Sequence, residues 1–323
     1  MNRVALIAPT FHGYESKIKK EFEVNGFEVR LRFTEGRLES PALKKGSRSA
    51  WTRRMSRHSE RILAELEDVR LTMVLVIRGE PMPPSFFAAL RAGHPEARFV
   101  LYEWDAEKRI KYLPLTAYFD VVMSFERADC AAHGFTYLPL FHIAEYTAAP
   151  LPERNLDIAF IGGYHPDRDR IFQSLVNQAR TLGLSYVIYE QIPLGLFAYL
   201  TFSRRQQILN RVRFRALSLR RCAELVRRAR VVVDIEHAGQ GGLTMRTFEA
   251  LAAGTKLITT NRSILDEPFY SPSTIAVIDR DSPRLDPTFI LTPNTSCNMR
   301  PYSLDRWVHA ILRAAGIAAK EEE

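Results

Sequence analysis

Short, continuously apolar runs alternate with amphipathic stretches along the first half of the chain. Such runs are typical of strands buried on both faces of a parallel sheet, and a 3.6-residue period between them indicates helices. The order strand, helix, strand therefore predicts a doubly wound sheet. The expected strands are 3–9, 27–33, 71–79, 97–104, 119–125 and a short 135–141, and the clearest helices are 15–25 and 58–66.

The second half repeats this alternation. A proline-bearing polar stretch without periodicity, 144–155, predicts the link between two domains, 1–148 and 149–323, with the last helix packing back on the first domain. The expected architecture is two Rossmann-like α/β domains facing a cleft. The strands expected in the second domain are 156–162, 185–190, 230–236, 256–260 and 275–279, with helices at 169–182 and 244–253.

The composition is that of a globular protein. The chain has 323 residues, 46% hydrophobic and 25% charged, which is enough to bury two cores. No targeting segment is recognisable, so we expect a cytoplasmic protein. The three cysteines show no C-x-x-C spacing and predict neither a disulfide framework nor a zinc site.

The net charge of +8 favours a phosphate-bearing or other anionic partner. Arginines concentrate in 203–230, directly after the apolar stretch 192–202. The whole region 192–230 could lie on an anionic membrane surface, or form a helix pair with a solvated basic face. A nucleic-acid partner is disfavoured, because no helix-turn-helix, RNP or zinc-finger pattern accompanies the arginines.

The segment 231–261 carries the most specific chemistry. A buried strand ends near Glu236, and a turn with Gly239, Gly241 and Gly242 leads into a helix. Glycines let a ligand approach the backbone, and a helix N-terminus favours an anion. This turn is suited to a diphosphate.

Arg246 and Glu249 lie three residues apart on one face of the helix that follows. They could bind a phosphate and the two hydroxyls of a ribose, or could simply form an ion pair with each other. The stretch 254–256 indicates an ordinary helix C-cap.

A second glycine turn follows the strand 156–162. Gly162 and Gly163 come at the strand end, with His165, Arg168 and Arg170 close behind, so cationic groups could reach the same anion. The dinucleotide fingerprint G-x-G-x-x-G does not occur here, which disfavours an NAD site.

The run "GQGGLTMRTFEALAAGTKLITTN" resembles the C-terminal nucleotide-sugar-binding segment of GT-B glycosyltransferases, particularly the bacterial surface-polysaccharide group. The resemblance extends over 101–106, 118–130, 137–141, 157–168 and 302–312. It implies a nucleotide-sugar donor in the second domain and a glycan or lipid-linked acceptor beside the first, with no separate cofactor. Glu249 takes the position where the family's glutamate commonly binds the donor ribose. The donor-binding residues so expected are Gly162, Gly163, His165, Arg168, His237, Gln240, Gly241, Gly242, Thr244, Arg246 and Glu249.

The sequence departs from the family at one position. Many retaining members have a second glutamate eight residues before the first, and Gly241 stands there instead. Gln240 or His237 could supply the missing polar contact, and the stereochemistry of transfer stays open.

Four residues at expected strand ends of the first domain are candidate catalytic groups. His12 or Glu15 could act as the general base of an inverting transfer. Glu15 could equally be a helix-start acid, and His12 a loop residue. Glu103 and Asp105 are second candidates, with loop capping as the alternative.

We expect no metal, because the arginines within 167–170 oppose a cation and can themselves neutralise a leaving phosphate. The leading hypothesis is therefore a metal-independent glycosyltransferase of surface-polysaccharide biosynthesis. The alternatives are a nucleotide-sugar epimerase of the same shape and a non-catalytic nucleotide- or nucleic-acid-binding protein.

Overall fold

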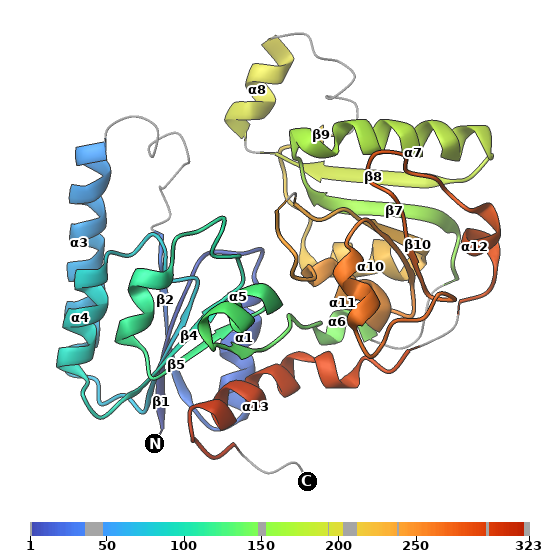
Figure 1. Cartoon of the computed structure of the whole chain (residues 1–323). Coiled ribbons are helices and arrows are strands. Elements are labelled where there is room, and N and C mark those ends of the chain that lie inside the picture. The colour runs from blue at the N-terminus through green and yellow to red at the C-terminus, as the bar shows by residue number, and fades with distance from the viewer. Residues whose placement is uncertain are drawn as a thin grey trace. The chain divides into compact units, whose positions relative to one another are not determined.

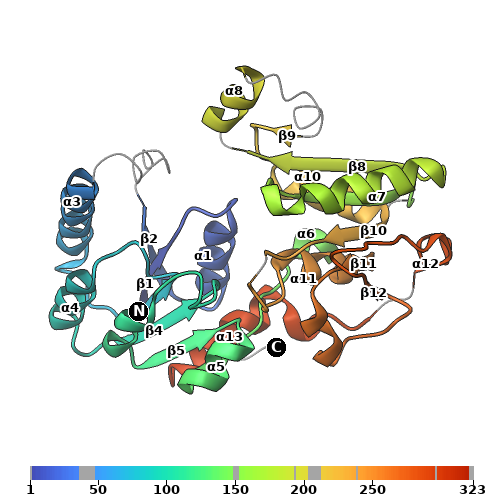
Figure 2. The ribbon, with the colours of Figure 1, turned by 45° about the horizontal axis from the view of Figure 1, so that its top comes forward.

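The computed structural model describes residues 2–35, 48–147, 153–192, 194–202, 212–237, 239–294 and 297–319. The chain forms two compact units, one of Met1–Pro139 with Leu304–Glu323 and the other of Leu140–Ser303. Each unit contains a six-stranded sheet flanked by helices (Figures 1 and 2). The predicted fold class, α/β with two doubly wound sheets, is confirmed.

All strand pairings of unit 1 are parallel, in the order β2-β1-β3-β4-β5-β6. The central strands β1, β3 and β4 are buried almost throughout, which explains their continuously apolar sequences. The strands are β1 (Arg3–Ala8), β2 (Glu28–Phe33), β3 (Met73–Ile77), β4 (Arg98–Glu103), β5 (Val121–Ser124) and β6 (Thr136–Tyr137).

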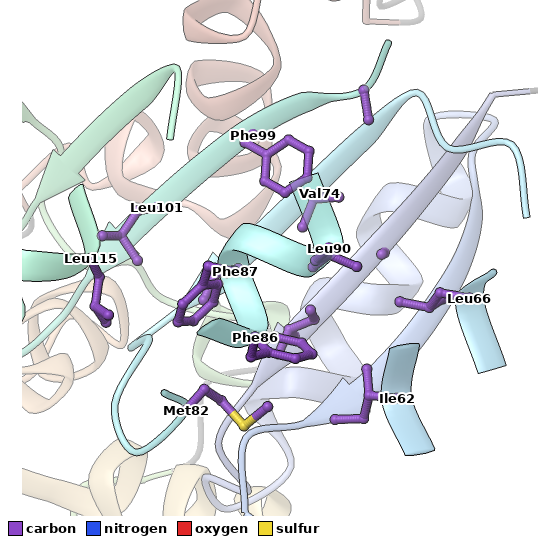
Figure 3. Packing of buried hydrophobic residues seen from close by; sticks show 14 of the residues in the cluster. Ile62, Leu66, Val74, Met82, Phe86, Phe87, Leu90, Phe99, Leu101 and Leu115 are labelled. Carbon is purple, nitrogen blue, oxygen red and sulfur yellow. The ribbon is translucent and has the colours of Figure 1, made fainter. Parts of the chain in front are cut away.

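Helices cover both faces of this sheet. On one face, Phe86, Phe87 and Leu90 of α4 pack with side chains of α3 and of the strands (Figure 3). On the opposite face, Trp307 of α13 meets Tyr102 of β4 edge to face, with ring centroids 4.9 Å apart. The helices are α1 (Tyr14–Val24), α3 (Arg48–Leu66), α4 (Pro84–Gly93), η1 (Leu113–Tyr118), α5 (Arg127–His133) and α13 (Leu304–Ala314).

Unit 2 is also fully parallel, in the order β12-β11-β10-β7-β8-β9. Ile171, Phe172 and Leu175 of α7 pack on the central strands β7 and β10. The strands are β7 (Leu156–Gly163), β8 (Tyr186–Gln191), β9 (Val212–Arg213), β10 (Ala229–Asp234), β11 (Lys256–Thr259) and β12 (Ile275–Val277). The helices are α6 (Ala144–Thr147), η2 (Pro166–Arg168), α7 (Asp169–Thr181), α8 (Leu194–Phe202), α10 (Leu219–Arg228), α11 (Met245–Ala252), η3 (Arg262–Asp266), α12 (Pro287–Leu291) and η4 (Arg300–Tyr302).

The region 192–230, for which a membrane surface and a helix pair were the alternatives, contains the helices α8 and α10 with the short strand β9 between them. Val212 is buried and pairs with Glu190, which adds β9 as a short edge strand beside β8. The helix α10 begins only at Leu219. Residues 203–211 lie outside the described part of the chain.

Two cations, the half-buried Arg154 and the buried Lys256, hold helix ends at the amino-terminal edge of the unit 2 sheet. The Arg154 guanidinium donates to the carbonyls of Ala253 (2.9 Å) and Gly254 (2.8 Å) and to the Thr255 hydroxyl (2.7 Å), and also reaches the Ala229 carbonyl. Lys256 donates to carbonyls at the end of α12. These donors satisfy carbonyls that the helices themselves leave without partners.

The predicted C-cap at the end of α11 is confirmed. Gly254 has φ +63°, in the left-handed region that favours glycine, and its N–H donates to the Leu251 carbonyl at 3.0 Å. Among the helices that the structure describes, none has both the length and the apolar character needed to cross a membrane.

Candidate functional site

The turn between β10 and α11 is held by an acid at the strand end. The Asp234 carboxylate accepts hydrogen bonds from the hydroxyls of Thr244 (2.6 Å) and Thr247 (3.0 Å). Thr244 is the N-cap of α11, and its hydroxyl oxygen accepts from the Arg246 N–H at 3.1 Å. The start of the helix is thus fixed directly over the carboxyl end of the strand, where a helix N-terminus attracts anions.

The glycines of this turn are held by their own backbone conformation and by a side chain that follows the neighbouring strand β11. Gly239 is exposed with φ +90°, which only glycine adopts without strain. The Asn261 side chain, which follows β11, donates to the carbonyls of Gly241 (3.0 Å) and Gly242 (3.3 Å). The turn is therefore anchored on two sides while its tip at Gly239 stays exposed.

The second glycine turn reaches the first through two histidines. The ring nitrogens Nε2 of His165 and His237 lie 3.1 Å apart, and the rings meet edge to face at 4.5 Å between centroids. Nδ1 of His165 contacts the Asp167 carboxylate. The strand ends of β7 and β10 are neighbours in the sheet, which explains how residues 72 positions apart come together.

Arg280 completes this group, and sequence reasoning missed it. Its guanidinium donates to the Asp167 carboxylate (2.9 Å) and to both the carbonyl and the carboxylate of Glu236 (3.1 Å each). Glu236 also accepts from the Thr260 hydroxyl. Burial alone would raise the pKa of Asp167, but His165 and Arg280 together lower it. The only sequence signal was an arginine shortly after the expected strand 275–279.

Arg246 and Glu249 form the ion pair that was the alternative to ligand binding. Arg246 Nη1 lies 2.6 Å from the Glu249 carboxylate and donates to the Tyr146 hydroxyl of α6 at 3.3 Å. Glu249 is 1% exposed, and burial raises the pKa of its carboxyl well above the ordinary value. The hydrogen bond from Arg246 to Tyr146 thus links α11 to α6, and the predicted contact of Glu249 with a ribose stays a prediction.

The remaining donor candidates lie on the same loops. Gly162 is packed so closely that an added Cβ would meet the Phe160 ring at 3.2 Å, whereas Gly163 is open. Arg168 donates to the Gly163 carbonyl at 3.4 Å. The Gln240 N–H donates to the His237 carbonyl at 3.1 Å. All eleven candidates come from unit 2, and their roles toward a donor stay predictions.

The catalytic candidates of unit 1 differ in exposure. His12 is exposed and has φ +52°, a left-handed conformation that is rare outside glycine. Glu15 is buried and accepts from the Phe11 N–H at 3.1 Å, as expected of a carboxylate at a helix start.

The acids after β4 are held by their neighbours. Glu103 is 0% exposed and accepts from the Gly79 N–H at 2.9 Å, and burial raises the pKa of its carboxyl to about 8. Asp105 accepts from Arg109 at 3.0 Å and lies 3.7 Å from Arg78. Only His12 of the four candidates is exposed.

Within the described ranges, no group of three or more His, Cys, Asp or Glu side chains is arranged to hold a metal ion. The predicted absence of a metal in catalysis is not tested by this finding.

Residues 171–284 match a protein-family model described as "Glycosyl transferase-like". No curated protein sequence matches the chain significantly. The matched residues run from α7 to the loop after β12 and therefore include the β10–α11 turn and Arg280.

Solved structures show the same fold at low sequence identity. They include a sucrose-phosphate synthase from Thermosynechococcus elongatus (TM-score 0.60, 13% identity, covering 98% of this chain and 96% of that chain). A second is the Anabaena protein Alr3699/HepE in complex with UDP and glucose (TM-score 0.56, 9% identity, 86% of each chain). A third is the UDP-GlcNAc 2-epimerase from Neisseria meningitidis bound to UDP-GlcNAc (TM-score 0.60, 10% identity, 96% of this chain and 98% of that chain). The chain therefore has the fold of GT-B glycosyltransferases, with a glycosyltransferase-like domain in its second half.

Proposed function

We propose that this protein is a glycosyltransferase that moves a sugar from a nucleotide-sugar donor to a glycan or lipid-linked acceptor in surface-polysaccharide biosynthesis. One observation carries the proposal. The segment matched by the glycosyltransferase-like model contains the N-terminus of α11 and Arg280. Together with the loop after β7, which precedes this segment, they form a hydrogen-bonded group at four neighbouring strand ends.

The proposed donor site uses this arrangement to bind a diphosphate. The N-terminus of α11 and the glycine turn before it supply oriented backbone dipoles, which stabilise negative charge. His165, His237 and Arg280 supply side-chain donors next to that turn. Fixed donors of this kind stabilise the charge that develops on a departing phosphate, so the proposed reaction needs no metal.

For the acceptor, the proposal assigns a general base in unit 1. An inverting transfer needs a group that takes the proton of the acceptor hydroxyl. Among the four candidates, exposure favours His12, because Glu15 and Glu103 are buried and their carboxylates already accept backbone N–H groups. We place the reaction on the cytoplasmic face of the cell membrane, where the 192–230 region would meet anionic lipid.

A nucleotide screen tests the donor site directly. The thermal stability of the protein is measured with UDP, GDP, CMP, dTDP and ADP in turn. A ligand at a hundredfold excess over its Kd stabilises the folded state by about 2.7 kcal/mol. We expect one nucleotide to raise the Tm and the substitution His237→Gln to reduce that shift, whereas His133→Gln, on α5 of unit 1, leaves it unchanged. A folded protein that responds to none of the five would refute the donor site.

The Arg246–Glu249 pair needs its own variant, because either single change leaves the other polar group without its partner and destabilises the chain. The double substitution Arg246→Met with Glu249→Gln removes both charges at once. We expect the double variant to fold. If these residues bind the donor, it no longer responds to the nucleotide. Retention of the full response would assign the pair to structure alone.

Epimerisation is the second candidate, favoured by the fold likeness to the UDP-GlcNAc 2-epimerase. The two activities differ in their need for an acceptor. The protein is incubated with the nucleotide-sugar that the screen identifies, with and without a glycan acceptor, and the sugar products are separated. Transfer releases nucleotide only with acceptor present, whereas an epimerase converts the sugar without it.

A further inference from the structure

The helix α8 has an unusual composition for a surface element. Its nine residues, LGLFAYLTF, include no charged side chain and leave no polar face. A helix that is apolar all round is normally buried in a core or in a membrane. We therefore ask which side chains of α8 are buried against the rest of unit 2.

Most of the described side chains of α8 are not covered by unit 2. Leu194 is 63% exposed and Phe202 is 87% exposed, with Leu196 exposed between them. Phe197 packs on the buried pair Ile192 and Val212 and so attaches the helix to the sheet edge. Figures 1 and 2 both show α8 standing apart from the sheet of its own unit.

Arginines border this apolar helix. Exposed Arg213 and Arg215 flank Phe214 at the edge strand β9, and the Phe214 ring lies 5.4 Å from the ring of Phe197. The Arg215 guanidinium lies over the Phe214 ring at 5.6 Å. The sequence contains no Asp or Glu from Gln191 to Ala223, so this stretch carries positive charge only. We call Leu194, Leu196, Phe202, Arg213, Phe214 and Arg215 the α8–β9 surface.

The chemistry of this surface selects among its potential occupants. A second copy of the chain would bring the same arginines, and their mutual repulsion opposes self-association through this face. A nucleic acid would pair with the arginines but leave Leu194 and Phe202 in water. An anionic bilayer satisfies both parts at once, because its phosphates attract the arginines and its acyl boundary takes up the large apolar side chains.

The length of α8 defines the mode of binding. Nine residues at about 1.5 Å each span roughly 13 Å, less than half of a hydrocarbon core of about 30 Å. We infer that the α8–β9 surface docks on an anionic lipid surface, with α8 lying in the interface and the arginines on lipid phosphates. The inference rests on the membrane placement in the proposed function and deepens it. It can be tested with no nucleotide present, so its failure and a failure of the donor site are distinguishable.

Vesicle co-sedimentation tests the docking. The full-length protein is mixed with phosphatidylcholine vesicles that contain or lack phosphatidylglycerol, at low and high salt. We expect binding to the anionic vesicles only, weakened by salt because the charge attraction is screened.

Three variants, each checked for folding by circular dichroism, locate the surface. Leu194→Ser with Phe202→Ser should weaken binding at least about tenfold, because two large side chains no longer insert. Arg213→Gln with Arg215→Gln should weaken it by about fivefold for each arginine removed. Leu291→Ser removes a leucine that is 52% exposed on α12 and should bind as the unchanged protein does.

Several results would overturn the inference. Equal binding to neutral and anionic vesicles would show that the arginines do not contribute to docking. If Leu291→Ser weakened vesicle binding as much as Leu194→Ser with Phe202→Ser, docking would not occur through the α8–β9 surface. Lipid-independent dimerisation that Leu194→Ser with Phe202→Ser abolishes would assign the surface to a second copy. Binding to random-sequence DNA that needs only the two arginines, with no binding to vesicles, would assign it to nucleic acid.

Discussion

The buried carboxyl of Glu103 makes a definite prediction about stability and pH. Glu103 lies at the end of β4, is fully buried, and accepts one hydrogen bond from the Gly79 N–H. Burial raises the pKa of its carboxyl from 4.5 to about 8. Between these two values the folded chain holds a proton that the unfolded chain has released, so unit 1 loses stability as the pH rises.

The magnitude follows from the two pKa values. One pKa unit corresponds to about 1.36 kcal/mol, and the difference of 3.5 between 8 and 4.5 sets a limit of about 5 kcal/mol. Between pH 5 and pH 8.5 the loss is about 4 kcal/mol, because both titrations are incomplete at the ends of this range. At about 2–4 °C per kcal/mol, this corresponds to a change in Tm of roughly 10 °C.

The substitution Glu103→Gln isolates this effect. Its amide oxygen can still accept from Gly79, but the side chain no longer titrates. We expect the Tm of the variant, followed by circular dichroism from pH 5 to pH 8.5, to fall less steeply than that of the unchanged protein. Parallel Tm curves for the two proteins would refute the reasoning, whatever the offset between them.

Asp120 provides a control of opposite sign. Its carboxylate accepts from Arg91 at 2.6 Å and 3.0 Å, and this hydrogen bonding lowers the pKa of Asp120 below the ordinary value of 3.8. The stability that it contributes is present above 3.8 and is lost as the pH falls through the lowered pKa. Asp120→Asn should therefore flatten the acid side of the curve and leave the alkaline side unchanged.

Two further predictions concern unit 2. Arg154→Met should lower the stability of the folded chain by about 3 kcal/mol in a denaturant titration, because the hydrogen bonds of its guanidinium to five acceptors at the ends of α10 and α11 and the start of β10 are lost. The matched change Arg228→Met removes one exposed hydrogen bond to Asn155 and should cost about 0.5 kcal/mol; equal effects would contradict the anchoring role of Arg154. Arg280→Gln should weaken nucleotide binding about tenfold in a calorimetric titration while the protein stays folded, because a charged donor is lost from the strand-end network; unchanged affinity would remove Arg280 from the proposed donor site.

The elements that the sequence predicted well are those with a strong local pattern. The expected strand 256–260 matches β11 to within one residue, and the expected helix 169–182 matches α7 equally well. The strand is a short apolar run and the helix a long amphipathic one, and turn residues bound both. The strand β9 was missed because two residues are too few to show an alternation of apolar and polar positions. Val212 is a strand residue only through its pairing with β8.

In the candidate site, too, contacts between sequence neighbours could be predicted, and contacts between distant residues could not. The glycine turn and its cap could be predicted because Thr244 and the glycines act on their immediate neighbours. Arg280 could not, since its partners Glu236 and Asp167 are 44 and 113 positions away and are brought near only by the strand order. For Arg246 and Glu249, the sequence left an ion pair and ligand binding as alternatives, and the structure has the ion pair. The burial of Glu249 depends on tertiary packing, which the spacing of the two residues does not reveal.

The strand order also explains why polar groups collect where they do in unit 2. Asp234 is the last residue of β10, whereas Asn261, His165 and Arg280 lie in the loops after β11, β7 and β12. These four strands form one contiguous parallel row of the sheet. Parallel pairing brings all four carboxyl ends to one edge, so the loops must share that edge and satisfy one another's hydrogen bonds there. Asp234 and Asn261 form hydrogen bonds with residues of the β10–α11 turn or its cap. His165 contacts His237, and Arg280 donates to Asp167, so these two connect neighbouring loops. The turn is consequently fixed before any ligand arrives, and a fixed set of dipoles and cations stabilises an anion without the cost of reorganising at the moment of binding.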